Sequence, residues 1–322
     1  MRITTIDAHV GGAPLRLVVE GAPDAGGGPL GERLETLRTA HDAFRRALML
    51  EPRGHSAMSG AIIVAPERAD AHAGVLFMHA GGWSAICGHG LIGVATIAAE
   101  RGLFVRPPES AEARLDTAAG PVTARLTFAP GGGRRVTSVA WSGVPAAVVR
   151  PGLAVRLARR PILVDVARAG ETYAIVDAEA CGVPLDRDHL PELVRTGREI
   201  VEAAEPAAGT SIEGVVFTGP PERDADLRAV AVYPDGAVDR SPGGMATSAV
   251  MAVLDAMGLL TEDRTLTLES LIGTRLSGRI VSRTTVNDAP AIVPEIEGRA
   301  FVTGEHTFVI DEDDPLRDGF VF

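Results

Sequence analysis

Hydrophobic residues along this chain alternate with polar ones in many short segments, a pattern typical of half-buried strands. The segments are separated by turns rich in glycine and proline, such as Gly11-Gly12 between the first two. The same strand character continues through most of residues 259–322. The clearest of the predicted strands are residues 2–7, 15–19, 61–64, 74–78, 215–217 and 227–232. The sequence therefore predicts a protein in which strands predominate.

Four segments have helical spacing instead. Residues 32–50 and 194–204 place apolar residues on one side only, which predicts two amphipathic helices. Residues 91–99 and 247–257 are apolar almost all round, and a helix of that kind must be buried on every side. The chain is thus expected to enclose two helices among its strands, and the fold class is α+β.

The two apolar helices lie in equivalent sequence windows. Cys87-Gly-His-Gly-Leu aligns with Gly243-Gly-Met-Ala-Thr, and a Gly-Leu pair follows each window at the same distance, at Gly102 and Gly258. A strand precedes each window as well. Internal repetition of this kind predicts two equivalent lobes. A ligand held between such lobes would meet the N-termini of both helices.

A helix N-terminus is a good place for anion chemistry. Its first N–H groups lack partners within the helix, and the helix dipole places partial positive charge there. A substrate carboxylate would be bound, and the thiol of Cys87 at such a position would be favoured as a thiolate, the form that acts as a base. The alternative is that Cys87 is only a small buried side chain, as most single cysteines are.

Composition limits the remaining choices. The 322 residues carry a formal net charge of -11, which argues against nucleic acid or an anionic membrane as a partner. Cys87 and Cys181 are the only cysteines, and no Cys/His spacing resembles a metal site, so no metal is expected. No apolar run reaches the length of ~18 residues that a membrane span needs, and the N-terminus lacks a signal-peptide pattern. A cytoplasmic protein with a small-molecule substrate is expected.

Several motifs resemble those of the proline racemase superfamily, over nearly the whole chain. Two of them are highly specific in combination, ICGHG at 86–90 and DRSP-x-G-x-x-TSA at 239–249. The others are TIDAHVGGAP at 5–14, EPRGHSAMSGA at 51–61, DTAAGPV at 116–122, ESLIGTRLSG at 269–278 and VTGEHTFVIDEDDP at 302–315. The resemblance outweighs the interpretation of Cys87 as a merely packed residue.

The resemblance implies a fold like that of diaminopimelate epimerase, with two pseudo-symmetric lobes, each a β-barrel-like sheet around a central helix. The first lobe is expected to comprise residues 1–130 and 290–322 and to carry Cys87. The second is expected over 131–289, with Asp239 and Gly243. No cofactor is expected, and a homodimer is expected by family analogy only.

The site residues that the resemblance implies are only partly present. Cys87 matches the first catalytic cysteine, and Gly88 and His89 match carboxylate-binding positions. In the second motif, Asp239 matches a ligand-contacting acid, and the backbone amides are expected at Gly244 and Met245. The second catalytic cysteine is missing, because Gly243 occupies its position. Met245 and Ala246 also replace the Thr-Gly that is usual there.

Loss of the second thiol changes the expected reaction. Racemisation in this family uses two thiols on opposite faces of Cα, whereas elimination needs one base and a leaving group. Relatives similar to trans-3-hydroxy-L-proline dehydratase keep the first cysteine and usually have threonine in place of the second. Dehydration of a 3-hydroxyproline to a cyclic imine is therefore the main prediction, with Cys87, His89 or Asp239 as the acid for the departing hydroxyl. The alternatives are proline racemase or 4-hydroxyproline 2-epimerase activity, and a non-catalytic amino-acid-binding protein.

Overall fold

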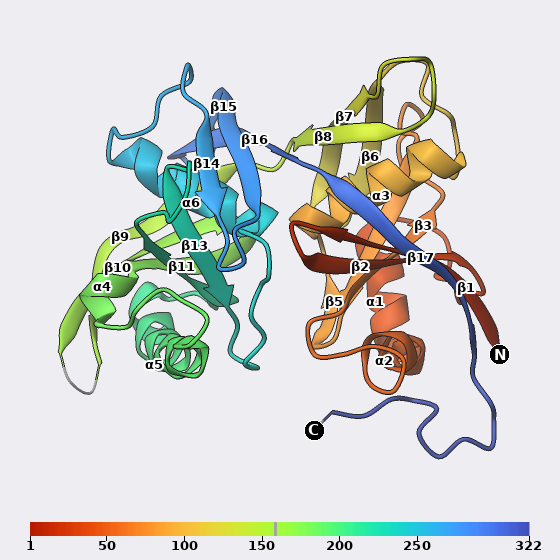
Figure 1. Cartoon of the computed structure of the whole chain (residues 1–322), viewed down its shortest axis with the longest axis horizontal. Helices are drawn as coiled ribbons and strands as arrows, with labels where there is room; N and C mark the ends of the chain where they lie inside the picture. Colours follow the sequence, from red (N-terminus) through yellow and green to blue (C-terminus); the bar gives the residue numbers. More distant parts are fainter. Residues whose placement is uncertain (158–159, 322) are drawn as a thin grey trace. The chain divides into compact units, whose positions relative to one another are not determined.

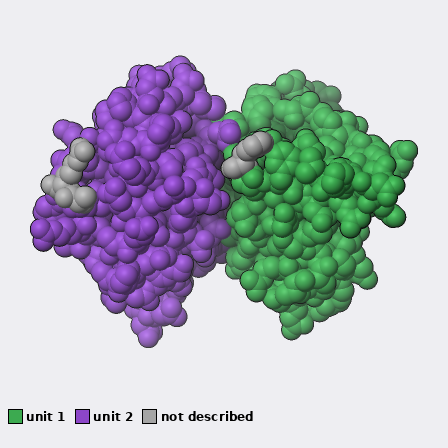
Figure 2. All heavy atoms as spheres, turned by 90° about the horizontal axis from the view of Figure 1, so that it is seen from below, with its two compact units in different colours: residues 1–141, 298–322 green, residues 142–297 purple. Residues whose placement is uncertain are grey.

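The computed structural model describes residues 1–157 and 160–321. The chain divides into two compact units, one formed by Met1–Trp141 with Gly298–Phe322 and the other by Ser142–Glu297. Figure 2 colours the two units separately. The borders expected from the sequence, at 130/131 and 289/290, lie earlier in the chain at both places.

The first unit is a sheet built from both ends of the chain (Figure 1). Its strand order is β17–β1–β2–β3–β4–β6–β7. β6 pairs with the first residues of β4, and the short β5 pairs with the last residues of β4. The helix α3 (Gly88–Arg101) packs against β1, β2, β3, β7 and β17. The strands are β1 (Arg2–Val10), β2 (Ala13–Glu20), β3 (Ser59–Val64), β4 (Ala73–His79), β5 (Gly82–Ser84), β6 (Glu112–Thr117), β7 (Gly120–Phe128) and β17 (Ala300–Val309), and β8 (Val136–Ser142) follows β7 in the chain.

The second unit is a closed ring of eight strands. Each of β9 to β16 pairs with the next, and the ring closes where Ile292 of β16 pairs with Ala146 of β9. The helix α6 (Gly244–Ala256) packs against β9, β10, β11 and β15. The strands are β9 (Ala146–Arg156), β10 (Pro161–Ala169), β11 (Glu171–Asp177), β12 (Gly214–Gly219), β13 (Leu227–Val232), β14 (Leu266–Glu269), β15 (Arg275–Val286) and β16 (Ala289–Gly298).

The two units follow one plan, as the internal repeat predicts. In each, an antiparallel hairpin is followed by a parallel, an antiparallel, a second parallel and a second antiparallel pairing, from β1 to β7 and from β10 to β15. The central helices also end alike. Gly102 and Gly258 have left-handed φ angles of 70° and 72°, and the next residue donates its N–H to a carbonyl five residues back. The prediction of two similar lobes, each with a central helix, is confirmed.

Apolar character decides where each helix lies. Residues Gly244 to Val253 of α6 are all buried, as expected for a helix that is apolar all round. The amphipathic α5 (Leu190–Ala208) instead buries one side, where Leu193, Ile200 and Ala204 join the core formed with β11 to β13. In the first unit, α1 (Leu30–Ala40) and α2 (Asp42–Met49) form a comparable core with β3 and β4. The short α4 (Ala178–Cys181) follows β11.

The single helix predicted over 32–50 is wrong in one respect, because two helices, α1 and α2, meet there at His41. His41 has a φ of -131°, outside the helical range. The next residue, Asp42, begins the new helix, and its carboxylate binds Arg45 and Trp83. One non-helical residue leaves the apolar spacing nearly intact, so the sequence pattern does not show the break.

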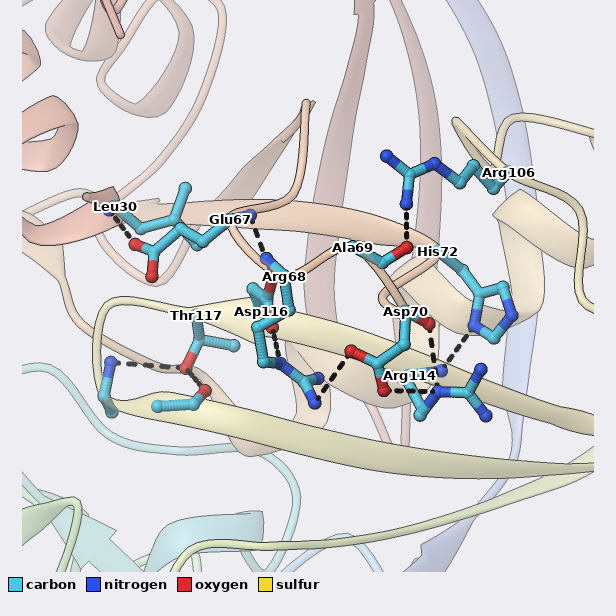
Figure 3. A network of polar contacts seen from close by, with 12 residues as sticks. Leu30, Glu67, Arg68, Ala69, Asp70, His72, Arg106, Arg114, Asp116 and Thr117 are labelled. Atoms are coloured by element: carbon cyan, nitrogen blue, oxygen red, sulfur yellow. Dashed lines mark hydrogen bonds and ion pairs between the residues drawn. The ribbon is translucent and has the colours of Figure 1, made fainter. Parts of the chain in front are cut away.

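A buried carboxylate fixes the same loop in both units. In the first, Asp116 at the end of β6 accepts backbone N–H groups of Glu67 and Arg68, each at 2.9 Å, and the Arg68 side chain at 2.6 Å (Figure 3). In the second, Glu269 at the end of β14 accepts the N–H groups of Glu222 and Arg223 at 2.8 and 3.3 Å. Asp116 therefore holds the loop that leads into β4, the strand beside β6. Glu269 holds the loop that leads into β13, the strand beside β14.

Candidate active site

Cys87 lies at the N-cap of α3, directly after the short hairpin of β4 and β5. Its carbonyl accepts the first helical hydrogen bond, from Leu91, at 2.9 Å, and its φ and ψ of -139° and 112° are those of extended backbone. The preceding residue, Ile86, is buried, and its carbonyl accepts the Ser84 hydroxyl at 2.5 Å. The half-buried thiol is thus carried on a segment that is fixed on both sides.

The hairpin before Cys87 is held by the start of α2. Arg45, which is only 6 % exposed, donates to the carbonyls of His79 and Ala80, and it also binds the Asp42 carboxylate. Asp42 in turn accepts the Trp83 indole N–H at 3.0 Å. The hydrogen bond from Arg45 is the main reason that the pKa of Asp42 lies below its usual value. These three side chains attach the cysteine-bearing segment to the body of the first unit.

His89 is the side chain beside the thiol. The Sγ atom of Cys87 lies 3.6 Å from both ring nitrogens of His89. A single linear N–H···S hydrogen bond would bring the sulfur closer to one nitrogen than to the other. The equal distances instead place the sulfur over the face of the imidazole ring. Cys87, Gly88 and His89, predicted together from the sequence, therefore form one local group at the start of α3.

Gly90 makes room for the thiol. A Cβ atom added at Gly90 would lie 2.8 Å from the Phe77 ring and 3.0 Å from the Sγ atom of Cys87. Sequence reasoning did not single out this glycine. The signal was present in the aligned windows, because the fourth position is glycine after Cys87 and alanine after Gly243.

The second helix start contains no thiol. Gly243 is the N-cap of α6, with a φ of 75°, and its carbonyl accepts the N–H of Thr247 at 2.8 Å. Gly244 and Met245, the expected amide donors, are the first two residues of the helix, and both are buried. Met245 is only 4 % exposed. Because its side chain is apolar, its backbone N–H is the polar group that it offers at the helix start.

Asp239 stands just before this helix, in a turn with Ser241. One of its carboxylate oxygens accepts the N–H and the hydroxyl of Ser241 at 3.2 and 3.3 Å. Ser241 does not cap the helix: Gly243 is the N-cap, and its N–H donates to the Ser241 hydroxyl at 3.1 Å. Ser241 instead stabilises the turn from Asp239 to Gly243, which precedes the helix. Asp239, Gly243, Gly244 and Met245 thus form the local group of the second unit.

Other candidate sites have weaker support. Cys181 is half-buried at the end of α4 and packs against the core of the second unit, and burial raises the pKa of its thiol to about 11. Among residues 1–157 and 160–321, no group of three or more His, Cys, Asp or Glu side chains could hold a metal ion. Within the same residues, no helix is long and apolar enough to cross a membrane.

The chain is similar to several known proteins over nearly its whole length. The family profile described as Proline racemase matches residues 5–321. A trans-3-hydroxy-L-proline dehydratase of Bacillus cereus is 39% identical over 99% of this chain and 97% of its own length. A 4-hydroxyproline 2-epimerase of Streptosporangium roseum is 40% identical over 98% of this chain and 97% of its own. The crystal structure of a hydroxyproline epimerase from Agrobacterium vitis, with bound trans-4-hydroxy-L-proline, matches with a TM-score of 0.90 and 27% identity, covering 100% of this chain and 95% of that one.

Proposed function

Because the chain belongs to the proline racemase family, we propose that it dehydrates trans-3-hydroxy-L-proline to a cyclic imine, with Cys87 as the base. Overall identity does not separate the two reactions, since the dehydratase and the epimerase relatives are 39% and 40% identical to the chain. The observation that carries the proposal is local. One helix start has a thiol beside a histidine, whereas the equivalent position of the other is Gly243.

The reaction needs one base and one proton donor. The thiolate of Cys87 takes the α-proton, and the electron pair of the broken C–H bond forms a double bond to the neighbouring ring carbon. The C–O bond at that carbon breaks at the same time, and the oxygen leaves as water after it accepts a proton. The enamine product then moves a proton from nitrogen to carbon and becomes the cyclic imine.

The stereochemistry of the substrate favours a site with one reactive face. In trans-3-hydroxy-L-proline the hydroxyl lies opposite the carboxylate, so it is on the same ring face as the α-hydrogen. A group on the Cys87 side can therefore both remove the α-proton and protonate the hydroxyl. His89, with both ring nitrogens 3.6 Å from the Cys87 sulfur, is the proton donor that this arrangement favours over Asp239.

The remaining site residues are proposed as substrate contacts. The N–H groups of Gly88 and His89 at one helix start, and of Gly244 and Met245 at the other, are suited to a carboxylate. They would also stabilise the negative charge that spreads into the carboxylate as the Cα–H bond breaks. Asp239 is proposed as a further polar contact to the amino acid. By family analogy alone the protein is proposed to be a homodimer, which light scattering tests. Its two cysteines favour a reducing, cytoplasmic location, which cell fractionation tests.

Proton NMR in deuterated buffer distinguishes the proposed reaction from its alternatives. Purified protein is incubated separately with trans-3-hydroxy-L-proline, trans-4-hydroxy-L-proline and L-proline. We expect loss of the first substrate with appearance of the imine, and no inversion of the other two. An epimer of the second or third substrate, with no imine from the first, would instead identify an isomerase. The absence of both turnover and α-hydrogen exchange would identify a binding protein.

The variants Cys87→Ala and Cys181→Ala test the role of the base in the same assay. Cys87→Ala should lose dehydration and α-hydrogen exchange together, because both begin with removal of the same proton. Cys181→Ala is the matched control and should retain both. Dehydration that persists in Cys87→Ala would contradict the proposal.

A further inference from the structure

The starts of α3 and α6 follow one plan but differ in backbone conformation at the N-cap. Cys87 has a φ of -139°, which any residue can adopt, whereas Gly243 has a φ of 75°. A positive φ of this size is comfortable for glycine and strained for a residue with a side chain. The start of α6 therefore differs from the start of α3 in backbone conformation as well as in the N-cap side chain.

In each helix start, the N-cap side chain competes for space with the residue three positions later. In α3 a Cβ added at Gly90 would lie 3.0 Å from both the Cβ and the Sγ of Cys87. In α6 a Cβ added at Gly243 would lie 3.2 Å from the Cβ of Ala246. Both distances are shorter than ordinary contact between carbon atoms. The first unit gives this space to the N-cap thiol, and the second gives it to Ala246.

Asp239 crowds the same space from the other side. A Cβ added at Gly243 would lie 2.8 Å from the Oδ2 atom of Asp239. That carboxylate is not free to swing away without cost, because its Oδ1 atom accepts two hydrogen bonds from Ser241. The backbone N–H of Asp239 also donates to the carbonyl of Ala231 in β13, at 2.9 Å. The turn that carries Asp239 is therefore anchored to the sheet.

We propose that Ala246 is a specificity-determining residue which, with Asp239, closes the space that a second catalytic thiol would need. The inference rests on the proposed function, in which Cys87 is the only thiol base. Racemisation requires a second group that returns a proton to the opposite face of Cα, and this helix start does not accommodate one. Elimination does not require it, because the electron pair leaves with the hydroxyl. The class of reaction is thus determined at residues 243 and 246 together.

Three variants test this proposal: G243C, G243C/A246G and G243C/A249G. Each is assayed for inversion of L-proline by chiral chromatography. We expect no inversion by G243C. We expect inversion by G243C/A246G, at roughly ten times the detection limit of the assay or more, because removal of one methyl group opens the space for the thiol. G243C/A249G is the matched control, since Ala249 is a buried alanine of the same helix, one turn further on, and should leave G243C inactive.

Titration with a thiol reagent shows whether the introduced thiol is present and accessible in each folded variant. Inversion by G243C as fast as by G243C/A246G would overturn the proposal. So would a G243C/A246G protein whose introduced thiol reacts with the reagent but which does not invert L-proline. Dehydration of trans-3-hydroxy-L-proline by the unmodified protein is measured in parallel, and its absence would count against the proposed function rather than against this inference.

The variant G90A tests the same competition from the first unit, even if the cysteine variants of the second do not fold. An alanine at residue 90 should displace the Cys87 thiol and the Phe77 ring. We expect α-hydrogen exchange to fall by roughly tenfold or more while the circular dichroism spectrum stays unchanged. Exchange at the original rate would show that the two positions do not compete, and would overturn the inference.

Discussion

Cys87 and Cys181 are both half-buried, but they lie in different surroundings. Cys87 lies at a helix N-terminus beside His89. Cys181 lies at the end of α4, where burial is the main cause that raises its pKa to about 11, although Arg160 acts in the opposite direction. The reactive form of a cysteine is the thiolate, so the exposure of a thiol does not by itself determine its reactivity.

Alkylation with iodoacetamide tests the raised pKa of the Cys181 thiol. At pH 8, about a thousandth of Cys181 is thiolate, because the pKa of about 11 lies three pH units higher. We expect the Cys87→Ala variant to take up label slowly, at a rate that rises roughly tenfold for each pH unit from 8 to 10. Intact-mass spectrometry over time measures the rate. A pH-independent rate in that variant would contradict the raised pKa.

In each unit a buried carboxylate holds one loop in place, which the hydrophobic pattern of the sequence does not show. Asp116 and Glu269 each hold the loop before the neighbouring strand, at equivalent places in the two units. Both are almost fully buried, at 3 % and 1 % exposure. Both oxygens of Asp116 accept hydrogen bonds, which replace those that water would have made, whereas the Oε1 atom of Glu269 accepts none within the described residues. The close-up in Figure 3 shows Asp116 bound to Arg68, and Asp70 between Arg68 and Arg114.

Replacement of Asp116 by Asn should therefore destabilise the protein. The change removes the charge that binds Arg68 and places an amide N–H₂ where acceptors are needed, at an expected cost of about 1–3 kcal/mol. Asp70→Asn is the matched control, because this carboxylate binds Arg68 and Arg114 with a side chain that is 58% exposed. The control should cost less than about 1 kcal/mol. Urea denaturation measures the loss of unfolding free energy in both variants. Equal losses would contradict the structural role given to the buried Asp116 carboxylate.

Sequence reasoning could place most elements but not the details that decide the chemistry. The strand 227–232 was predicted at its observed bounds, and the repeat around Cys87 and Gly243 anticipated the common plan of the two units. The break at His41 was missed because it preserves the apolar spacing. The conformation of Gly243 and the position of the Asp239 carboxylate depend on contacts within the folded turn, which no local pattern encodes.

At the scale of the whole molecule, the second unit is continuous in sequence, whereas the first is not. Ser142–Glu297 contains all of β10 to β15, nearly all of β16, and the whole of β9, so the ring of eight strands closes within this segment. It also has its own hydrophobic core, built by α5 against β11 to β13. The first unit needs β17 from the other end of the chain to complete its pairing with β1.

A fragment of residues 142–297 should consequently fold alone. We expect a dispersed amide NMR spectrum and a cooperative thermal transition, since a closed ring leaves no open sheet edge. A fragment of residues 1–141 lacks β17 and should be less structured, with a weaker transition. The reverse order of stability would contradict the assignment of β17 to the first unit's sheet.

The pairing of β1 with β17 also has a consequence for biosynthesis. Arg2 pairs with Val309, so the two partners are separated by almost the full length of the chain. At translation rates of about 5–20 residues per second, β1 is synthesised ~15–60 s before its partner strand. During that interval β1 can pair only with β2, while the whole of the second unit is synthesised before β17. The N-terminal strand thus leaves one edge exposed on the nascent chain, where a chaperone could protect it.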